Sequence, residues 1–234
     1  MKLGIMQPYF LPYIGYFQLI NTVDKFVIYD NIKYTKKGWI NRNRIIANGR
    51  NEYITLPLKN DSDSLNIDQR YLTNSFYLEK NKLLRRIKEN YLRAPYFSET
   101  FKLFEDILSF DNYNLFDFVF NSLIMVCNYL ALSKEFIVSS TIPIDHTLRA
   151  EDKVLAICKQ MNTDCYINPI GGANIYSKEK FISNKITLFF LNSNPIVYPQ
   201  LSNEFIPNMS ILDVMMFNSK KSIMHFLKNE YTLI

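Results

Sequence analysis

The sequence has little glycine, cysteine and histidine for its length. Its 234 residues include six glycines, three cysteines, two histidines and one tryptophan. His146 and His225 are far apart, and no histidine or cysteine cluster has metal-ligand spacing, so we expect no metal site formed by the protein. The cysteines are an odd, scattered set, which predicts reduced thiols and a cytoplasmic protein.

Other signatures are also absent. No uninterrupted run of about 18 apolar residues occurs, so we expect no membrane insertion. The opening MKLGIMQP lacks the basic segment and apolar run of a signal peptide, which again predicts the cytoplasm. No P-loop, Gly-x-Ser-x-Gly elbow or Rossmann fingerprint is present. A composition of 48% apolar and 21% charged residues is typical of a folded globular protein.

The positive charge is concentrated in one segment. Between Lys25 and Arg50 lie seven basic residues and a single acidic one, Asp30, and this excess exceeds the net charge of +5 for the whole chain. A nucleic-acid face usually spreads its basic residues over more of the domain, so we expect no nucleic-acid partner. A short cluster fits the phosphates of a nucleotide. A solvated basic loop is the alternative.

Strand and helix patterns alternate along the chain, with a helical block between two α/β halves. Strands are predicted over residues 2–7, 25–30, 135–141, 164–172 and 185–191, and helices over 13–21, 148–161, 210–219 and 221–231. A hairpin is predicted around Asn48-Gly49, and three helices between residues 74 and 132. We therefore predict an α/β fold, a parallel-sheet, mononucleotide-binding-like core with a helical insertion. Residues 1–73, 74–132 and 133–234 would be parts of one structural unit.

Glycines mark two places where a ligand could come close to the backbone. Asn168, Gly171 and Gly172 follow a predicted strand, and ligands of open α/β sheets lie at the carboxyl ends of strands. Gly15 lies within the first predicted helix, where it costs about 1 kcal/mol relative to alanine. Packing or a bound phosphate would explain its presence. A tight strand-to-helix connection without a ligand is the alternative for residues 168–172.

The segment between the first strand and the first helix is rich in proline and aromatic residues. We predict that it binds substrate through Gln7, Tyr9, Tyr13 and Tyr16, because an amide and flat phenol rings suit a base or a sugar. The prolines would hold the rings on a stiff turn and so lower the entropy lost on binding. The neighbouring apolar side chains are assigned to the core.

The segment KKGWINRNR, residues 36–44, is the second candidate for substrate binding. Lys36, Trp39 and Arg42 are its predicted contacts. On a strand, Arg42 and Arg44 would share one face, from which guanidinium groups could hold a diphosphate. A surface-exposed hairpin is the alternative.

Two residues are candidates for acid–base chemistry. His146 is the one histidine that lies in a predicted loop, and Asp30 ends the second predicted strand. Asp30 would there meet a substrate amine or hydroxyl.

A resemblance to a known family rests on three separated blocks. These are MQPYFLPYIGYFQLINTVDKFVIYDNIKYTKKGWINRNRI, YINPIGGANIY and VYPQLSNEFIPNMSILDVMMFN, which resemble the WbqC-like family. The resemblance implies a role in the biosynthesis of O-antigen, lipopolysaccharide or another surface polysaccharide. It further implies an enzyme, a transferase or ligase, that modifies a nucleotide-linked amino sugar by acyl or aminoacyl transfer. ATP or an acyl-CoA would supply the activation, and other polysaccharide-biosynthesis enzymes would be partners.

A weaker likeness concerns the first strand–helix–strand unit. It resembles the nucleotidyltransferase-like fold, with Tyr13 and Tyr16 at the two positions of that fold's signature histidines. A phenol with a pKa of about 10 donates only a neutral hydrogen bond. Either adenylyl transfer has therefore been lost or Lys36, Lys37 and Arg42 supply the charge instead, and nucleotide binding is compatible with both. The other functional hypotheses are a non-catalytic nucleotide-sugar-binding partner of a glycosyltransferase and, least favoured, an RNA-binding module.

Overall fold

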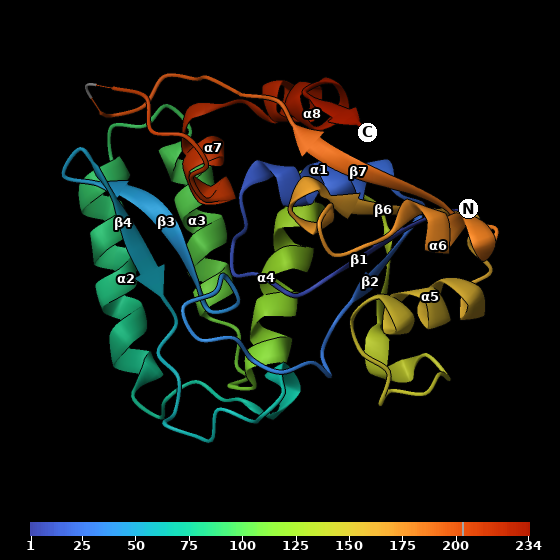
Figure 1. Ribbon diagram of the computed structural model, residues 1–234. Helices are drawn as coiled ribbons and strands as arrows, with labels where there is room; N and C mark the ends of the chain where they lie inside the picture. The colour runs from blue at the N-terminus through green and yellow to red at the C-terminus, as the bar shows by residue number, and fades with distance from the viewer. Residues whose placement is uncertain (203) are drawn as a thin grey trace.

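A six-stranded sheet occupies one side of the molecule in the computed structural model, which describes residues 1–202 and 204–234 (Figure 1). The strand order is β5-β2-β1-β6-β7-β8. Five strands are parallel, and β8 pairs antiparallel with β7 at one edge. The strands are β1 (Lys2–Met6), β2 (Lys25–Ile28), β5 (Glu135–Val138), β6 (Cys165–Pro169), β7 (Thr187–Ser193) and β8 (Tyr231–Leu233).

The direction of winding reverses at the centre of this sheet. From β1 the chain steps outward through β2 to β5, then returns to the other side of β1 as β6 and β7. The order is that of a doubly wound sheet, in which ligands bind where the winding reverses, outside the carboxyl ends of the strands. The predicted α/β fold with a parallel core is confirmed. The crevice expected at its switch point lies between β1 and β6.

Helices cover both faces of the sheet. One face carries α1 (Ile14–Thr22), α4 (Leu115–Tyr129) and α8 (Lys220–Asn229), and the other carries α5 (Ala150–Gln160) and α6 (Lys178–Ser183). Neighbouring strand residues point to opposite cores: Phe26 and Ile28 belong to the first, and Val27 to the second. Two apolar layers therefore fix the sheet and the positions of its strand ends.

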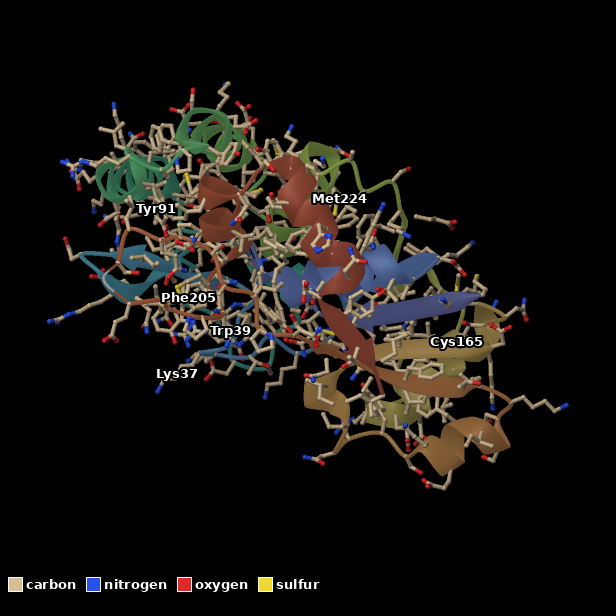
Figure 2. All side chains as sticks on the ribbon, turned by 90° about the horizontal axis from the view of Figure 1, so that it is seen from above. Lys37, Trp39, Tyr91, Cys165, Phe205 and Met224 are labelled. Atoms are coloured by element: carbon tan, nitrogen blue, oxygen red, sulfur yellow. The ribbon has the colours of Figure 1, made fainter. Side chains whose placement is uncertain are left out.

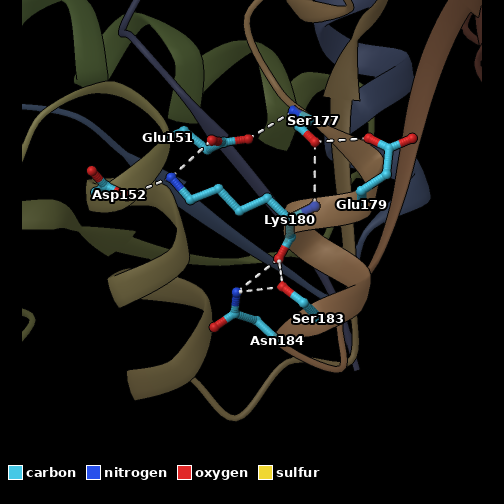
Figure 3. Close-up of polar contacts among 7 residues, drawn as sticks. All are labelled: Glu151, Asp152, Ser177, Glu179, Lys180, Ser183 and Asn184. Carbon is cyan, nitrogen blue, oxygen red and sulfur yellow. Dashed lines mark hydrogen bonds and ion pairs between the residues drawn. The ribbon is translucent and has the colours of Figure 1, made fainter.

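An ion-pair network joins α5 to α6 beside the end of β6 (Figure 3). The Lys180 ammonium lies 3.0 Å from the Glu151 carboxylate and 2.7 Å from the Asp152 carboxylate. The backbone N–H of Ser177 donates to Glu151 at 2.7 Å. The loop between β6 and α6, which contains the 3₁₀ turn η3 (Ile170–Gly172), is thus tied to α5 at its far end.

A helical block and a separate hairpin lie at the opposite side of the molecule from α5 and α6 (Figure 1). The block contains α2 (Phe76–Tyr91), α3 (Phe97–Leu108) and α4, and the hairpin contains β3 (Arg42–Ala47) and β4 (Arg50–Thr55). Asn48 and Gly49 have φ of 52° and 70°, as a type I′ turn requires, so the predicted hairpin is confirmed. The Tyr91 hydroxyl accepts the N–H of Ile46 at 2.8 Å and fastens the hairpin to α2.

Three short elements remain. They are η1 (Ile67–Gln69), η2 (Ser139–Thr141) and α7 (Ile211–Phe217). The core that covers one sheet face continues without interruption through α2, α3, α4 and α7. The division of the chain at residues 73 and 132 stays a prediction. Among the described helices, none has the length and apolar character needed to cross a membrane.

Candidate functional site

The turn that leads from β1 into α1 is held by segments far away in the sequence. The Leu11 carbonyl accepts the Ser210 hydroxyl at 2.7 Å, and the Phe10 carbonyl accepts the Asn43 amide at 3.1 Å. Leu11 has a φ of 44°, a left-handed conformation that non-glycine residues rarely adopt without support from their surroundings. The turn therefore contacts β3 and the segment that leads into α7.

A cavity of about 390 Å³ opens between this turn and the end of β6. We call it the main crevice. It lies at the switch point of the sheet, where a doubly wound fold binds its ligands. Among the residues that the structure describes, its lining includes no charged side chain. The lining residues are Ile5, Met6, Gln7, Tyr9, Tyr13, Tyr16, Tyr29, Trp39, Asn168, Pro169, Gly171, Gly172, Ile175 and Tyr176.

A second cavity of about 310 Å³, here called the side chamber, shares three walls with the main crevice. The shared walls are Tyr9, Tyr13 and Trp39. The chamber adds Pro12, Asn43, Arg44 and Asn208, and Arg44 is its one charged lining residue among those described. A third cavity of about 290 Å³ lies beyond Tyr13, between α1 and the loop before α7. Tyr13 thus borders all three spaces.

Several polar groups face the main crevice without a protein partner. No hydrogen bond joins the side-chain amide of Gln7, or the hydroxyls of Tyr9 and Tyr13, to another described residue. Burial raises the pKa of both Tyr9 and Tyr13, so their hydroxyls stay protonated. These groups can donate to or accept from a ligand, as a sugar or a base requires.

Tyr16 differs from the other two tyrosines. Its side chain is 1% exposed, and its hydroxyl donates to the backbone carbonyl of Gln7 at 2.8 Å. Burial raises its pKa well above the ordinary value. The ring lines the crevice, but the hydroxyl fixes the end of β1. Tyr16 thereby positions Gln7.

Two glycines make room for crevice side chains. A Cβ on Gly15 would overlap the ring of Tyr13, which folds back over the start of α1. A Cβ on Gly172 would collide with the amide of Asn168, whose oxygen accepts the Tyr166 hydroxyl at 3.0 Å. Neither glycine has a positive φ, so backbone conformation does not require glycine at either position. Glycine is needed there because a larger residue would occupy the space of the Tyr13 and Asn168 side chains.

Gly171 is unlike its neighbour Gly172. A Cβ there would meet no atom within 4 Å, and the residue borders the main crevice. A methyl group at this position would therefore extend into open space next to the cavity.

Asp30 and His146 lie outside the three cavities. Asp30 follows β2 and is 5% exposed, and its carboxylate accepts the Ser139 hydroxyl at 2.7 Å and the N–H of Ser140 at 3.0 Å. The His146 Nδ1 accepts the Asn31 amide at 2.9 Å, and its Nε2 lies 3.0 Å from a backbone carbonyl. The structure brings the two residues together through Asn31, but away from the main crevice. Their catalytic roles stay predictions.

Lys36 and Arg42 also lie outside the cavities. The Lys36 ammonium pairs with exposed Asp63 at 2.7 Å. The Arg42 Nε donates to the Gly38 carbonyl at 3.1 Å, and its guanidinium lies 4.4 Å from the ring centre of Tyr53. Figure 2 shows neighbouring Lys37 at the edge of the molecule, with Trp39 further inside. Of the predicted contacts in this segment, only Trp39 lines the crevice.

Sequence reasoning left some lining residues out of the predicted site. Tyr29 directly follows β2, so a position at the carboxyl edge of the sheet is a usable signal. Asn208 and Tyr176 lie in loops and carry no comparable signal. Among the described residues, no group of three or more His, Cys, Asp or Glu could hold a metal ion.

Comparison with known proteins places these motifs in one family. The model of the WbqC-like protein family matches residues 7–225. The chain belongs to the WbqC-like protein family. A curated relative, "Uncharacterized protein Rv1507c" of Mycobacterium tuberculosis (strain ATCC 25618 / H37Rv), is 27% identical over 220 residues, with 92% of each chain covered. No solved structure matches the chain, so the resemblance to the nucleotidyltransferase-like fold is not confirmed.

The family match spans most of the residues that form the site. It includes the turn after β1, the loop around Trp39, the end of β6 and the segment that leads into α7. The first two WbqC-like blocks line the main crevice together, although more than a hundred residues separate them, and the third reaches the side chamber through Asn208.

Proposed function

We propose that this WbqC-like protein binds a nucleotide-linked sugar in the main crevice, as a cytoplasmic component of surface-polysaccharide biosynthesis. The observation that carries the proposal is the set of unpartnered polar groups of Gln7, Tyr9 and Tyr13 at the switch point of the sheet. The cavity volume and its mixture of rings and a few polar groups are typical of small-molecule sites.

Each lining group has a task in this proposal. Tyr9, Tyr13 and Trp39 offer flat faces on which a base or a sugar ring stacks. Gln7 offers both a donor and an acceptor at the end of β1. Gly171 leaves the backbone after β6 open to close approach by the ligand. Because the described lining is uncharged, it suits the neutral parts of the ligand.

We further propose that the protein modifies an amino sugar carried on the nucleotide, by acyl or aminoacyl transfer. In such a transfer the sugar nitrogen forms a bond to an activated carbonyl carbon, the bond to the leaving group breaks, and the nitrogen loses a proton. ATP or an acyl-CoA would provide the activation. The described residues contain no carboxylate or imidazole that lines the crevice, so Asp30 and His146 would need a ligand that extends toward β2.

The same observation favours a second function. A protein that binds a nucleotide-linked sugar and presents it to a glycosyltransferase needs stacking rings and hydrogen bonds but no acid or base. The main crevice supplies the stacking rings and the hydrogen-bonding groups, and its described lining contains no acid or base. The two functions share the ligand and differ in turnover.

The test is a binding and turnover experiment on the purified chain. Thermal-shift and calorimetric titrations with a panel of nucleotide-linked sugars should identify one that binds, with the matching free nucleoside as a weaker ligand. Incubation of that complex with ATP and an amino acid, or with acetyl-CoA, followed by mass spectrometry, then detects transfer. A modified sugar supports the enzyme; binding without a product supports the second function; no binding to any member contradicts both.

A further inference from the structure

Arg44 is placed differently from the other basic residues of its segment. It lies on β3, with Arg42 two residues before it on the same face of the strand. Its guanidinium lies 5.4 Å from the ring centre of Trp39, the residue that forms a wall between the side chamber and the main crevice. Arg44 is also a lining residue of the side chamber, whereas Arg42 is not.

The donors of the two arginines are used to different extents. Arg42 donates through Nε and Nη2 to the carbonyls of Gly38 and Lys37, so its guanidinium supports the loop before β3. Arg44 donates through Nη2 to the Asn208 carbonyl at 2.9 Å, while its Nε is buried and has no partner. Because the Nε has almost no accessible surface, a ligand in the chamber would bond to the Nη hydrogens, and Nη1 has no partner among the described residues.

The charge of Arg44 is likewise unbalanced. It forms no ion pair with any described carboxylate, and the described lining of the side chamber contains no acidic residue. Partly buried cations in proteins are usually paired with an anion. An arginine fork matches the oxygens of a phosphate.

We infer that the side chamber is an anion subsite in which Arg44 binds the phosphate oxygens of a diphosphate group. This inference rests on the proposed function for the identity of the ligand: one molecule would place its uncharged part in the main crevice and its diphosphate beside Arg44. The shared walls Tyr9, Tyr13 and Trp39 connect the two spaces. The diphosphate-binding role predicted for Arg42 and Arg44 together is thereby assigned to Arg44 alone.

Arg42 provides a matched control for the test. Arg44→Gln and Arg42→Gln remove the same charge from the same face of β3, next to an aromatic ring in both cases. Calorimetry with inorganic pyrophosphate as the probe should show binding to the wild type. Arg44→Gln should lower this affinity about tenfold or more, while Arg42→Gln should stay within about threefold, because only the first removes a charge-assisted donor of the chamber. Thermal unfolding of both variants shows that they are folded.

The outcomes separate this inference from the proposed function. The wild type should bind the nucleotide-linked sugar more tightly than the free nucleoside. The Arg44→Gln variant should bind the two with similar affinity. If the nucleotide-linked sugar binds both variants as tightly as the wild type, the anion subsite is wrong and the main-crevice proposal stands. If pyrophosphate binding depends on Arg44 but no nucleotide-linked sugar binds, the subsite stands and the proposed function is wrong. Failure of the wild type to bind pyrophosphate, or an equal loss in both variants, contradicts the subsite.

Discussion

Two groups of polar side chains lie at the carboxyl edge of the same sheet, and they differ in how they are satisfied. Beyond β2 and β5, the side chains of Asp30, Asn31, Ser139 and His146 bond to one another. Lys153 joins them at 3.1 Å from the Asn31 side chain. In the main crevice, by contrast, the Gln7 amide and two phenol hydroxyls have no described partner.

The difference indicates which group serves the fold and which serves a ligand. A buried polar group that is fully bonded contributes to the stability of the folded chain and has little capacity left for a ligand. An unpartnered group in a cavity gains its hydrogen bonds only on binding. We therefore expect substitutions beyond β2 and β5 to change stability, and substitutions in the crevice to change affinity.

The glycine pair after β6 should give the largest effects. Gly172→Ala should lower the free energy of unfolding by about 1–3 kcal/mol, because the new Cβ displaces the Asn168 amide. Gly171→Ala should change it by no more than about 0.5 kcal/mol, since its Cβ meets open space. Chemical denaturation measures both.

Ligand affinity gives a second comparison of Gly171→Ala with Gly172→Ala. Both alanine variants should bind the nucleotide-linked sugar more weakly, Gly172→Ala because Asn168 moves and Gly171→Ala because its methyl group occupies ligand space. An unchanged affinity in Gly171→Ala would show that the ligand does not approach this turn.

Asp30→Ala should lower the free energy of unfolding by about 1–3 kcal/mol. The substitution leaves the Ser140 N–H without its carboxylate acceptor, and leaves the buried Ser139 hydroxyl with the Asn31 side chain as its one remaining described acceptor. Ligand affinity, measured by calorimetry below the unfolding temperature, should be the same as in the wild type. Asp30→Asn, which keeps one acceptor oxygen, is the control and should recover part of the lost stability. If the Asp30→Ala protein is as stable as the wild type but no longer binds the ligand, Asp30 belongs with the residues that serve the ligand.

Gln7→Met should weaken binding about tenfold and leave stability nearly unchanged. The two side chains are of similar length, but methionine has neither the donor nor the acceptor that the crevice presents to the ligand. Titration calorimetry gives the affinity and thermal unfolding gives the stability. A clear drop in melting temperature with unchanged affinity would place Gln7 among the residues that serve the fold.

The tyrosine pair should show the smallest effects, and in opposite assays. Tyr13→Phe should reduce affinity by about 0.5–1.5 kcal/mol without changing stability, because its hydroxyl has no described partner. Tyr16→Phe should reduce stability by a similar amount, because its hydroxyl holds the Gln7 carbonyl at 2.8 Å. Finding both losses in the same assay would contradict the distinction between the two hydroxyls.

The sequence predicted the elements better than their ends. Hydrophobic periodicity located the parallel strands and the three helices of residues 76–129, and the Asn48-Gly49 dipeptide located the hairpin turn. It extended the last helix to residue 231, although the chain leaves α8 at Asn229 and forms the short edge strand β8. It also gave no sign of the six-residue helix α6. Elements this short depend on their tertiary neighbours more than on local pattern.

The site could be predicted only as far as motifs mark strand ends. Gln7, Tyr13, Asn168 and Gly171 line one crevice because the carboxyl ends of β1 and β6 are adjacent, which a parallel sheet implies. Which arginine faces a cavity could not be read from the alternating pattern of residues 41–44. It depends on the loop before α7, which reaches Arg44 from 164 residues away.

The most direct test of the account is a crystal structure of the protein with the nucleotide-linked sugar that binds best. We predict ligand density in the main crevice, with the Gln7 amide within hydrogen-bond distance and the rings of Tyr13 and Trp39 against the ligand. Ligand density beside Asp30 and His146, with the main crevice empty, would contradict the account.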